Sequence, residues 1–301
     1  MAVQTKTRHR AEDSQESNRS AEQRPFKLQL LKWIGNKQRF AAEIISHFPR
    51  EFGAYHEPFL GSGAVLGSLA PERAFASDVF APLVEIWRTL RDDPQQLKVW
   101  YRDRLEQTQQ QGKVAAYDAI KASYNAQPNA ADLLFLCRAC YGGVVRFRKK
   151  DGHMSTPCGA HEPISPANFA HRVDVWHERT HGAEFSVMDF EAAMRRTEPG
   201  DLVYCDPPYQ HSQQILYGAQ AFSLERLFDS IASCKQRGVY IALSIDGSKR
   251  SGTLACELPI PNGLFAREAT VNCGRSMLRR FQMEGQSLAR EVVADRLLLT
   301  Y

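Results

Sequence analysis

The tetrapeptide Asp206-Pro207-Pro208-Tyr209 holds the side chains with the clearest chemical potential in this sequence. The apolar run at 202–205 just before it predicts a buried parallel strand, which the two prolines would end. Asp206 would then lie at the carboxyl end of a core strand, where open α/β sheets place their ligand crevice. There its carboxylate and the Pro207 carbonyl could accept the hydrogens of an exocyclic amino group, while the Tyr209 ring stacks on the flat base. The same four residues would also fit a turn that only ends a strand, so other parts of the chain have to decide.

A glycine turn after an earlier strand-like segment predicts a second half of the site. Gly61 and Gly63 would let a ligand approach the backbone closely, and the helix that follows offers unpaired N–H groups. The next strand-like run, 74–78, ends in Asp78, which is placed to accept hydrogen bonds from ribose hydroxyls. The glycine spacing, G-x-G-x-x-x-G, differs from the dinucleotide-binding fingerprint. Together the turn and the acid indicate a pocket for an adenosine-containing cofactor.

Size and composition set the broad class. The chain has 301 residues, of which 43% are hydrophobic, enough for one large or two modest domains. It has no apolar run that could span a bilayer and no signal peptide, so we expect no membrane partner. Seven cysteines in such a chain favour reduced thiols in the cytoplasm. The net charge of +4 permits a nucleic-acid partner without requiring one.

Helical, Gln-rich segments between about 90 and 162 lead to a predicted hairpin at 144–155 that turns at Asp151-Gly152. The hairpin carries four cations and an aromatic residue in succession: Arg146, Phe147, Arg148, Lys149 and Lys150. This pattern suits a DNA groove and its phosphates, although a solvated basic hairpin would have the same composition.

Two cysteine-containing pairs in the same region, Cys137-x-x-Cys140 and Cys158-x-x-His161, have a spacing that can hold zinc. Cys137 and Cys140, however, lie in an apolar, helix-like run, where buried cysteines behave as small hydrophobic residues. We therefore expect core cysteines and no metal, with zinc as the alternative.

The other segments are expected to form the helices and strands that position these residues. Residues 1–25 are polar and charged, which predicts a disordered tail. Ser223 is expected to cap a helix, and 166–177 is expected to form another. Further strands are expected at 183–190, which contains Asp189, at 239–245 and at 296–301, whereas the basic segment 273–286 reads as a loop.

Four motifs, taken in chain order, resemble those of the Dam-type adenine DNA methyltransferases. They are Lys32-Trp33-x-Gly35-x-Lys37, Glu57-Pro58-Phe59-x-Gly61-x-Gly63, Ser77-Asp78 and Asp206-Pro207-Pro208-Tyr209. Their order, with the recognition insertion between cofactor motif and catalytic motif, marks the alpha group of that family. The resemblance runs from about residue 28 to 301.

The resemblance implies an α/β fold, a Rossmann-like methyltransferase sheet of seven mostly parallel strands whose last hairpin is antiparallel. Residues 26–93 and 164–301 would form this catalytic domain. Residues 94–163 would form an inserted, mainly helical target-recognition domain that carries the β-hairpin. The implied reaction moves the methyl group of S-adenosylmethionine to the exocyclic amino group of an adenine flipped out of double-stranded DNA.

The resemblance also implies the site residues, at the positions that match the family's motifs. Asp206, Pro207 and Tyr209 would be catalytic. The cofactor would contact Trp33, Lys37, Phe59, Gly61, Gly63, Asp78, Asp189 and Asp206. DNA would contact the hairpin residues Arg146 to Lys150, together with Arg275 and Arg279. We further expect a monomer or weak dimer, with a cognate restriction endonuclease as a possible partner.

The recognition segment departs from the family pattern. The family tends to have Asn-Gly before the hairpin and Phe-Asn-Val-Pro after it, whereas this chain has Gly142-Gly143 and Met154-Ser155-Thr156-Pro157. The recognition sequence therefore cannot be carried over. Other readings of the residues are the same chemistry on DNA cytosine, on RNA or on a protein glutamine, or a DNA-binding module whose cofactor pocket is idle.

Overall fold

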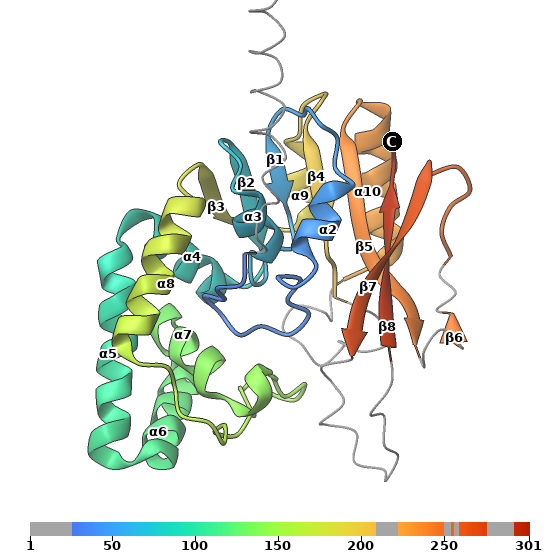
Figure 1. Ribbon diagram of the computed structural model, residues 1–301. Helices are drawn as coiled ribbons and strands as arrows, with labels where there is room; N and C mark the ends of the chain where they lie inside the picture. The colour runs from blue at the N-terminus through green and yellow to red at the C-terminus, as the bar shows by residue number, and fades with distance from the viewer. Residues whose placement is uncertain (1–25, 209–221, 250–253, 256–258, 276–291) are drawn as a thin grey trace, which may run out of the picture.

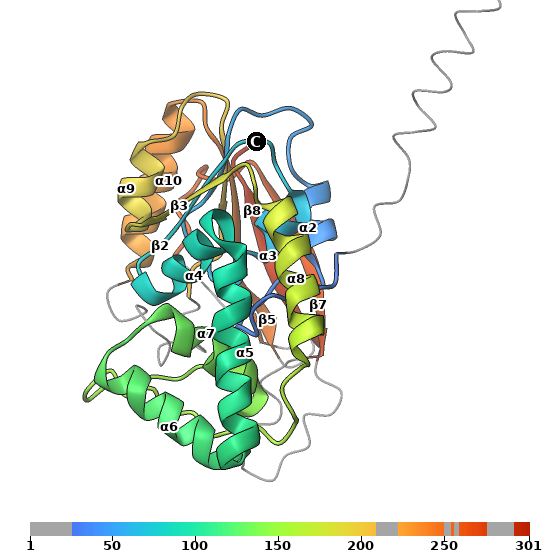
Figure 2. The ribbon, with the colours of Figure 1, turned by 90° about the vertical axis from the view of Figure 1, so that its left-hand side faces the viewer.

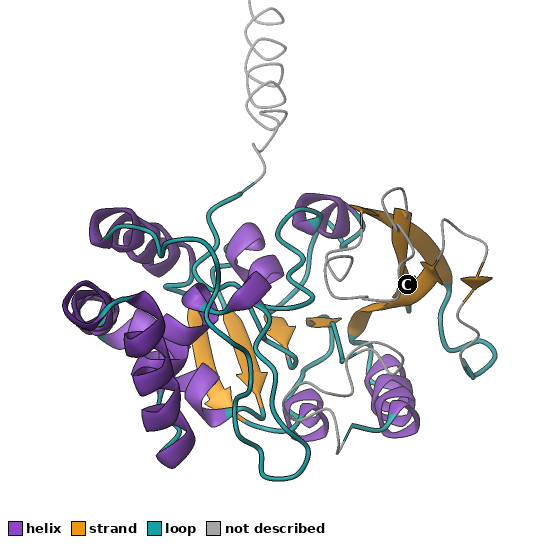
Figure 3. Ribbon diagram, turned by 90° about the horizontal axis from the view of Figure 1, so that it is seen from below, coloured by secondary structure: helices purple, strands orange, loops and turns teal. Residues whose placement is uncertain are grey.

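The computed structural model describes residues 26–208, 222–249, 254–255, 259–275 and 292–301. These residues form one mixed sheet with the strand order β3-β2-β1-β4-β5-β8-β7 and helices on both of its faces (Figures 1 and 3). The strands are β1 Tyr55–Glu57, β2 Ala74–Asp78, β3 Ala183–Val187, β4 Leu202–Cys205, β5 Tyr240–Lys249, β6 Leu254–Ala255, β7 Arg267–Arg275 and β8 Val292–Leu299.

Strands β1 to β5 run parallel, and β8 lies antiparallel between β5 and β7. The predicted α/β sheet of mostly parallel strands with an antiparallel last hairpin is thereby confirmed. The two-residue strand β6, which pairs antiparallel with the end of β5, is an addition that the sequence did not predict.

The helices are α2 Ala41–Ser46, α3 Ala64–Leu69, α4 Ala81–Asp92, α5 Pro94–Gln111, α6 Lys113–Ala126, α7 Ala130–Ala139, α8 Pro166–Arg179, α9 Phe190–Arg195 and α10 Leu224–Gln236. The Ser223 hydroxyl accepts a hydrogen bond from the Arg226 backbone N–H at 3.3 Å, as expected for the cap of α10. Figure 2 shows α9 and α10 on one side of the sheet and α2, α3 and α8 on the other.

Alternation along the central strand builds a core on each side of the sheet. Leu202 and Tyr204 of β4 belong to the core beneath α3 and α4, whereas Val203 and Cys205 belong to the core beneath α9 and α10. Because all four residues of β4 are buried, the strand is held from both faces and its carboxyl end is fixed.

The segment from α5 to α7 lies on the side toward which the parallel strands end (Figure 1). Its buried side chains are continuous with the core of the sheet: Tyr101 of α5 stacks on Phe169 of α8 with ring centroids 4.0 Å apart. The division into a catalytic domain and a recognition domain at 94–163 stays a prediction. Among the described helices, none is long and apolar enough to cross a membrane.

Candidate active site

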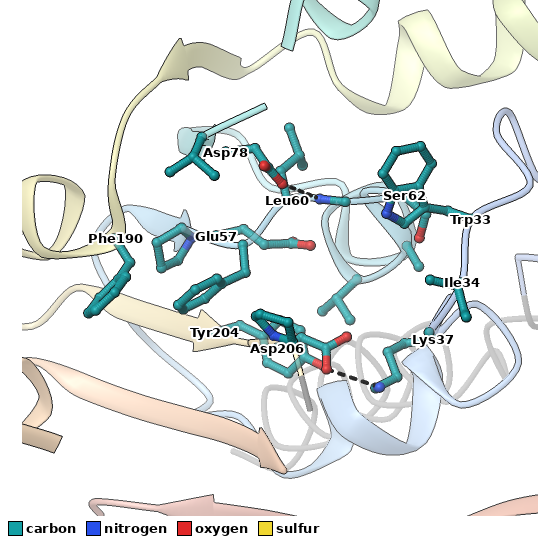
Figure 4. A pocket seen from close by; sticks show the side chains of 18 of the residues that line it. Trp33, Ile34, Lys37, Glu57, Leu60, Ser62, Asp78, Phe190, Tyr204 and Asp206 are labelled. Carbon is teal, nitrogen blue, oxygen red and sulfur yellow. Dashed lines mark hydrogen bonds and ion pairs between the residues drawn. The ribbon is translucent and has the colours of Figure 1, made fainter. Parts of the chain in front are cut away.

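A cavity of about 380 Å³ opens at the carboxyl ends of β1, β2 and β4, where parallel sheets place their ligands (Figure 4). The residues that line it come from six segments: Trp33, Ile34, Gly35 and Lys37; Glu57, Pro58, Phe59, Leu60, Gly61, Ser62, Ala64 and Val65; Asp78 and Val79; Asp189 and Phe190; Tyr204, Asp206 and Pro208; and Phe222. The glycine turn and the Asp206 strand end, predicted separately from the sequence, therefore lie on one cavity.

Asp206 follows β4 directly, and its carboxylate is held by a buried lysine. The Lys37 ammonium lies 3.0 Å from Asp206 Oδ1, and the Lys37 side chain is 6% exposed (Figure 4). The lysine comes from the loop before α2, where the Lys37 carbonyl accepts the Phe40 N–H at 2.8 Å. Ion pairing to a fixed lysine orients the Asp206 carboxylate at the edge of the cavity.

Asp78 ties the glycine turn to the neighbouring strand. Its two carboxylate oxygens accept the backbone N–H groups of Gly61 at 3.1 Å and Phe80 at 3.0 Å. Burial raises the pKa of Asp78 to about 6, although these backbone hydrogen bonds oppose the shift. Sequence reasoning assigned Asp78 to a ribose and missed this second task, which is to hold the turn that faces the ligand.

The turn itself needs glycine. Gly63 has φ 59°, a left-handed backbone that glycine adopts without strain, and it is the residue before α3. A Cβ at this position would lie 3.0 Å from two ring carbons of Trp87, whose indole N–H donates to the Gly61 carbonyl at 3.2 Å. Gly63 thus lies just behind the cavity wall, packed on Trp87, rather than in the lining.

Glu57 is a site residue to which sequence reasoning gave no role. It is 3% exposed, and its Oε2 accepts the Tyr55 hydroxyl at 2.7 Å and the Leu66 N–H at 2.9 Å. Burial, which outweighs these hydrogen bonds, raises its pKa to about 8, so the carboxyl is mainly protonated at neutral pH. The sequence did contain a signal for Glu57. It ends β1, which is parallel to β2, and Asp78 was predicted as a site residue because it ends β2.

Aromatic rings form the wall on the α9 side. Phe59 stacks on Phe190 at 5.3 Å, and Phe222 meets both rings edge-on. Asp189 precedes Phe190 and caps α9 by accepting the Glu191 N–H at 3.0 Å, so one carboxylate oxygen already has a structural partner. This wall gives the cavity an apolar face for a flat group.

The predicted catalytic residues are only partly described. Asp206 and Pro208 line the cavity, and Pro207 lies between them but is not part of the lining. Tyr209 lies outside the described residues, so its stacking role stays a prediction.

The predicted hairpin is present as a short antiparallel turn. Phe147 bridges to Met154, and the Arg148 N–H donates to the His153 carbonyl at 2.9 Å. Lys149 and Lys150 at its tip are exposed. Arg148 also pairs with Asp151 at 2.8 Å, and Arg146 is half-buried. The turn therefore presents cations to solvent, as a DNA contact requires.

Phe147, which the sequence suggested for DNA contact, has its ring turned inward. It meets the Phe80 ring edge-on at 5.5 Å and lies 6.3 Å from the Tyr124 ring. Phe80 in turn lies 6.4 Å from Trp33, a cavity-lining residue. The half-buried Phe147 ring therefore anchors the hairpin to the core, and its contact with DNA stays a prediction.

The two remaining predicted DNA contacts are Arg275 and Arg279. Arg275 is the last residue of β7, and its backbone pairs with Val292 of β8. Arg279 lies outside the described residues.

The cysteines of the possible zinc motif pack as core residues. Cys137 and Cys140 are buried, and the backbones of Cys140 and Cys158 pair in an isolated antiparallel β-bridge without a disulfide between them. Burial raises the pKa of the Cys140 thiol to about 12, as expected for a cysteine packed in an apolar core. Within the part of the chain that the structure describes, no three His, Cys, Asp or Glu residues gather into a metal-binding group.

Comparison with known proteins places the chain. Residues 33–257 match the family described as "D12 class N6 adenine-specific DNA methyltransferase". The "Type II methyltransferase M1.LlaDCHI" of Lactococcus lactis subsp. cremoris is 27% identical over 82% of this chain and 88% of its own length. The "DNA adenine methylase" of Vibrio cholerae is 25% identical over 71% of this chain and 80% of its own length. The "DNA N-6-adenine-methyltransferase" of Escherichia phage P1 is 27% identical over 74% of this chain but only 30% of its own.

The match covers both the glycine turn and the Asp206 strand end, which line the same cavity. The predicted resemblance is confirmed: the chain belongs to the D12 class N6 adenine-specific DNA methyltransferase family and is an enzyme of DNA adenine methylation.

Proposed function

We propose that the enzyme transfers the methyl group of S-adenosylmethionine to the N6 amino group of an adenine flipped out of duplex DNA. The observation that supports this most is that Asp206, the glycine turn and Asp78 all border one cavity. A donor bound at the turn and an amino group held at Asp206 would then be neighbours. Methyl transfer requires this proximity.

The residues present fit the donor. A cavity of about 380 Å³ is within the range of small-molecule sites, and it offers aromatic walls with a few convergent polar groups. Glu57 has one carboxyl oxygen held by Tyr55 and Leu66, and its side chain lies on the cavity. Trp33, Phe59, Gly61, Asp78 and Asp189 would bind the donor. When bound, S-adenosylmethionine supplies the activated methyl group.

On the acceptor side, Asp206 and the Pro207 carbonyl would accept the two amino hydrogens and turn the nitrogen lone pair toward the methyl group. Tyr209 would stack on the flipped adenine, which recovers roughly 1–3 kcal/mol of the stacking lost on flipping. As the nitrogen gains positive charge, the fixed Asp206 carboxylate stabilises it without reorganising. Lys37 keeps that carboxylate in one direction.

The basic hairpin and the surrounding segment at 94–163 would bind DNA. Arg146, Arg148, Lys149 and Lys150 would contact phosphates or base edges, and Phe147 would hold the hairpin in place from behind. Arg275 and Arg279 would add phosphate contacts. Since Gly142-Gly143 replaces the Asn-Gly of the family pattern, the sequence that is recognised has to be determined directly.

We propose that the enzyme works in the cytoplasm as a monomer or weak dimer. The Type II name of the Lactococcus relative supports a restriction–modification role, in which a cognate endonuclease would share the recognition sequence.

The test is to incubate the purified chain with unmethylated DNA and methyl-labelled S-adenosylmethionine, digest the DNA to nucleosides and analyse them by mass spectrometry. We expect N6-methyladenine with the wild type and none with Asp206→Ala. Label in cytosine, or in RNA offered in parallel, would replace the proposal by the corresponding amino-methyltransferase. Donor binding without any transfer would point to a binding module.

A further inference from the structure

A second carboxylate reaches the Lys37 ammonium from the last strand of the sheet. Asp295 Oδ2 lies 3.3 Å from Lys37 Nζ, and the Asp295 side chain is 8% exposed. Asp295 is on β8, two strands away from β4 in the sheet, and belongs to none of the motifs that mark the family. The buried ammonium is therefore shared by Asp206 and Asp295.

Asp295 stands at an unusual place for a carboxylate. Along β8 it shares a face with Leu297 and Leu299, which are fully buried in the core beneath α3 and α4. Burying a charge on such a face is unfavourable unless the charge is paired, and an apolar side chain of similar size would usually be tolerated better. The Lys37 ammonium supplies the pairing, which connects Asp295 to the carboxylate at the cavity.

Sharing the ammonium changes what Asp206 offers to a substrate. Lys37 paired with Asp206 alone would form a neutral pair, and the positive charge would oppose a second positive charge developing nearby. With Asp295 included, one ammonium faces two carboxylates, so its positive charge is shared between Asp206 and Asp295. Glu57 adds no charge while it is protonated. An amino nitrogen that becomes positive during the transfer favours such a site.

We propose that Asp295 is a positioning residue for methyl transfer, which acts through Lys37 to fix the direction and the negative charge that the Asp206 carboxylate presents to the amino group. This inference rests on the proposed role of Asp206. It adds Asp295, from the antiparallel pair of strands β7 and β8, to the catalytic residues at the end of β4. No family motif marks this pair of strands.

The test compares Asp295→Asn, which removes the charge at nearly constant shape, with Asp295→Glu, which keeps it. The rate of the chemical step is measured in a single turnover at saturating DNA and donor, and the dissociation constants of both ligands are measured separately. We expect Asp295→Asn to slow the chemical step roughly 10- to 100-fold. Both dissociation constants should stay within about threefold, because Asp295 acts on the transition state through Lys37 and Asp206. Asp295→Glu should recover most of the rate.

Glu268→Gln is the matched control, since it removes one charge from the adjacent strand β7, where Glu268 pairs with Arg296 at 2.7 Å. It should leave the chemical step unchanged. Should Asp295→Asn not fold, Asp295→Ser, which leaves room for water, replaces it.

Two outcomes overturn the inference: a chemical step in Asp295→Asn within twofold of wild type, or an equal loss in Asp295→Asn and Asp295→Glu that follows a loss of Tm. Asp206→Ala is measured alongside. If that variant stays active, the proposed role of Asp206 fails; if it is inactive while Asp295→Asn is normal, only the present inference fails.

Discussion

The charged side chains of the cavity are fixed by defined partners, whereas those at the tip of the basic hairpin are exposed to solvent. In the cavity each carboxyl group has a defined partner: backbone N–H groups hold Asp78, Lys37 holds Asp206, and Tyr55 holds Glu57. In the hairpin the cations at the tip, Lys149 and Lys150, are exposed. The backbone of the hairpin is fixed through the Phe147 ring, a few backbone hydrogen bonds and the exposed Arg148–Asp151 ion pair.

The difference follows from what each region has to do. Methyl transfer depends on atoms held in a near-attack geometry, where a displacement of about 1 Å can lower the rate a hundredfold. Phosphate binding depends mainly on charge within reach, which flexible surface side chains supply. Substitutions in the cavity should therefore change rate or stability, and substitutions at the hairpin tip should change DNA affinity.

The largest effect is expected from Asp206→Ala. Without the carboxylate, neither the orientation of the amino group nor the stabilisation of its positive charge remains, so methyl transfer should fall at least 10²- to 10³-fold, on the order seen when one fixed electrostatic group is lost. Donor affinity, measured by isothermal titration, should change by less than about tenfold, since the glycine turn and Asp78 are intact. Near-normal transfer in this variant would remove Asp206 from the mechanism.

Two glycine substitutions, one in each region, compare how tightly the cavity turn and the hairpin are packed. Gly63→Ala places a Cβ 3.0 Å from Trp87 at φ 59°, whereas Gly152→Ala places one in open space at φ 69°. Both substitutions should cost about 1–2 kcal/mol of backbone strain, and Gly63→Ala about 1–3 kcal/mol more from overpacking. Urea unfolding measures the free energies. Equal losses would contradict the view that the turn is packed more tightly than the hairpin.

The hairpin tip should control DNA affinity. Lys149→Ala combined with Lys150→Ala should weaken DNA binding roughly tenfold at moderate salt. The slope of log K against log salt should become shallower by about 0.9 for each phosphate that the variant no longer neutralises. The rate at saturating DNA should stay at the wild-type value.

Arg195→Ala is the control for this experiment, because it removes an exposed cation of α9, outside the segment proposed to bind DNA, that pairs with Glu191 at 4.0 Å. It should leave the salt slope unchanged. An unchanged slope in the hairpin variant as well would place the DNA elsewhere.

The smallest effect concerns the buried acid at the cavity. Because the pKa of Glu57 is raised to about 8 in the folded protein, its protonated form is favoured there, and its contribution to stability is lost as pH rises from about 4.5 through about 8. Glu57→Gln should remove this dependence, so its Tm relative to wild type should rise by a few degrees between pH 6 and pH 9. Asp78 also titrates near pH 6 but is common to both proteins. A constant difference would show that Glu57 is ionised throughout.

Local patterns predicted the parts of the site that local structure builds. The apolar run before Asp206 and the strand that ends at Asp78 form two edges of the cavity. The glycine turn follows β1, which lies between these two strands in the sheet. The orientation of Phe147 was not predictable, because an aromatic residue among cations reads equally well as a DNA contact or as an anchor. Asp295 carried no signal at all: only the pairing of β8 with β5 brings it near Lys37.

The row of rings from Trp33 through Phe80 to Phe147 links the cavity to the basic hairpin. The exposed Lys149 and Lys150 at the tip are not part of this row. Changing Phe147 should instead shift Phe80, the neighbour of the cavity-lining Trp33. If the hairpin reads the DNA as proposed, altering the cations around this ring should change target choice alone, whereas replacing the ring should alter target choice and catalysis together.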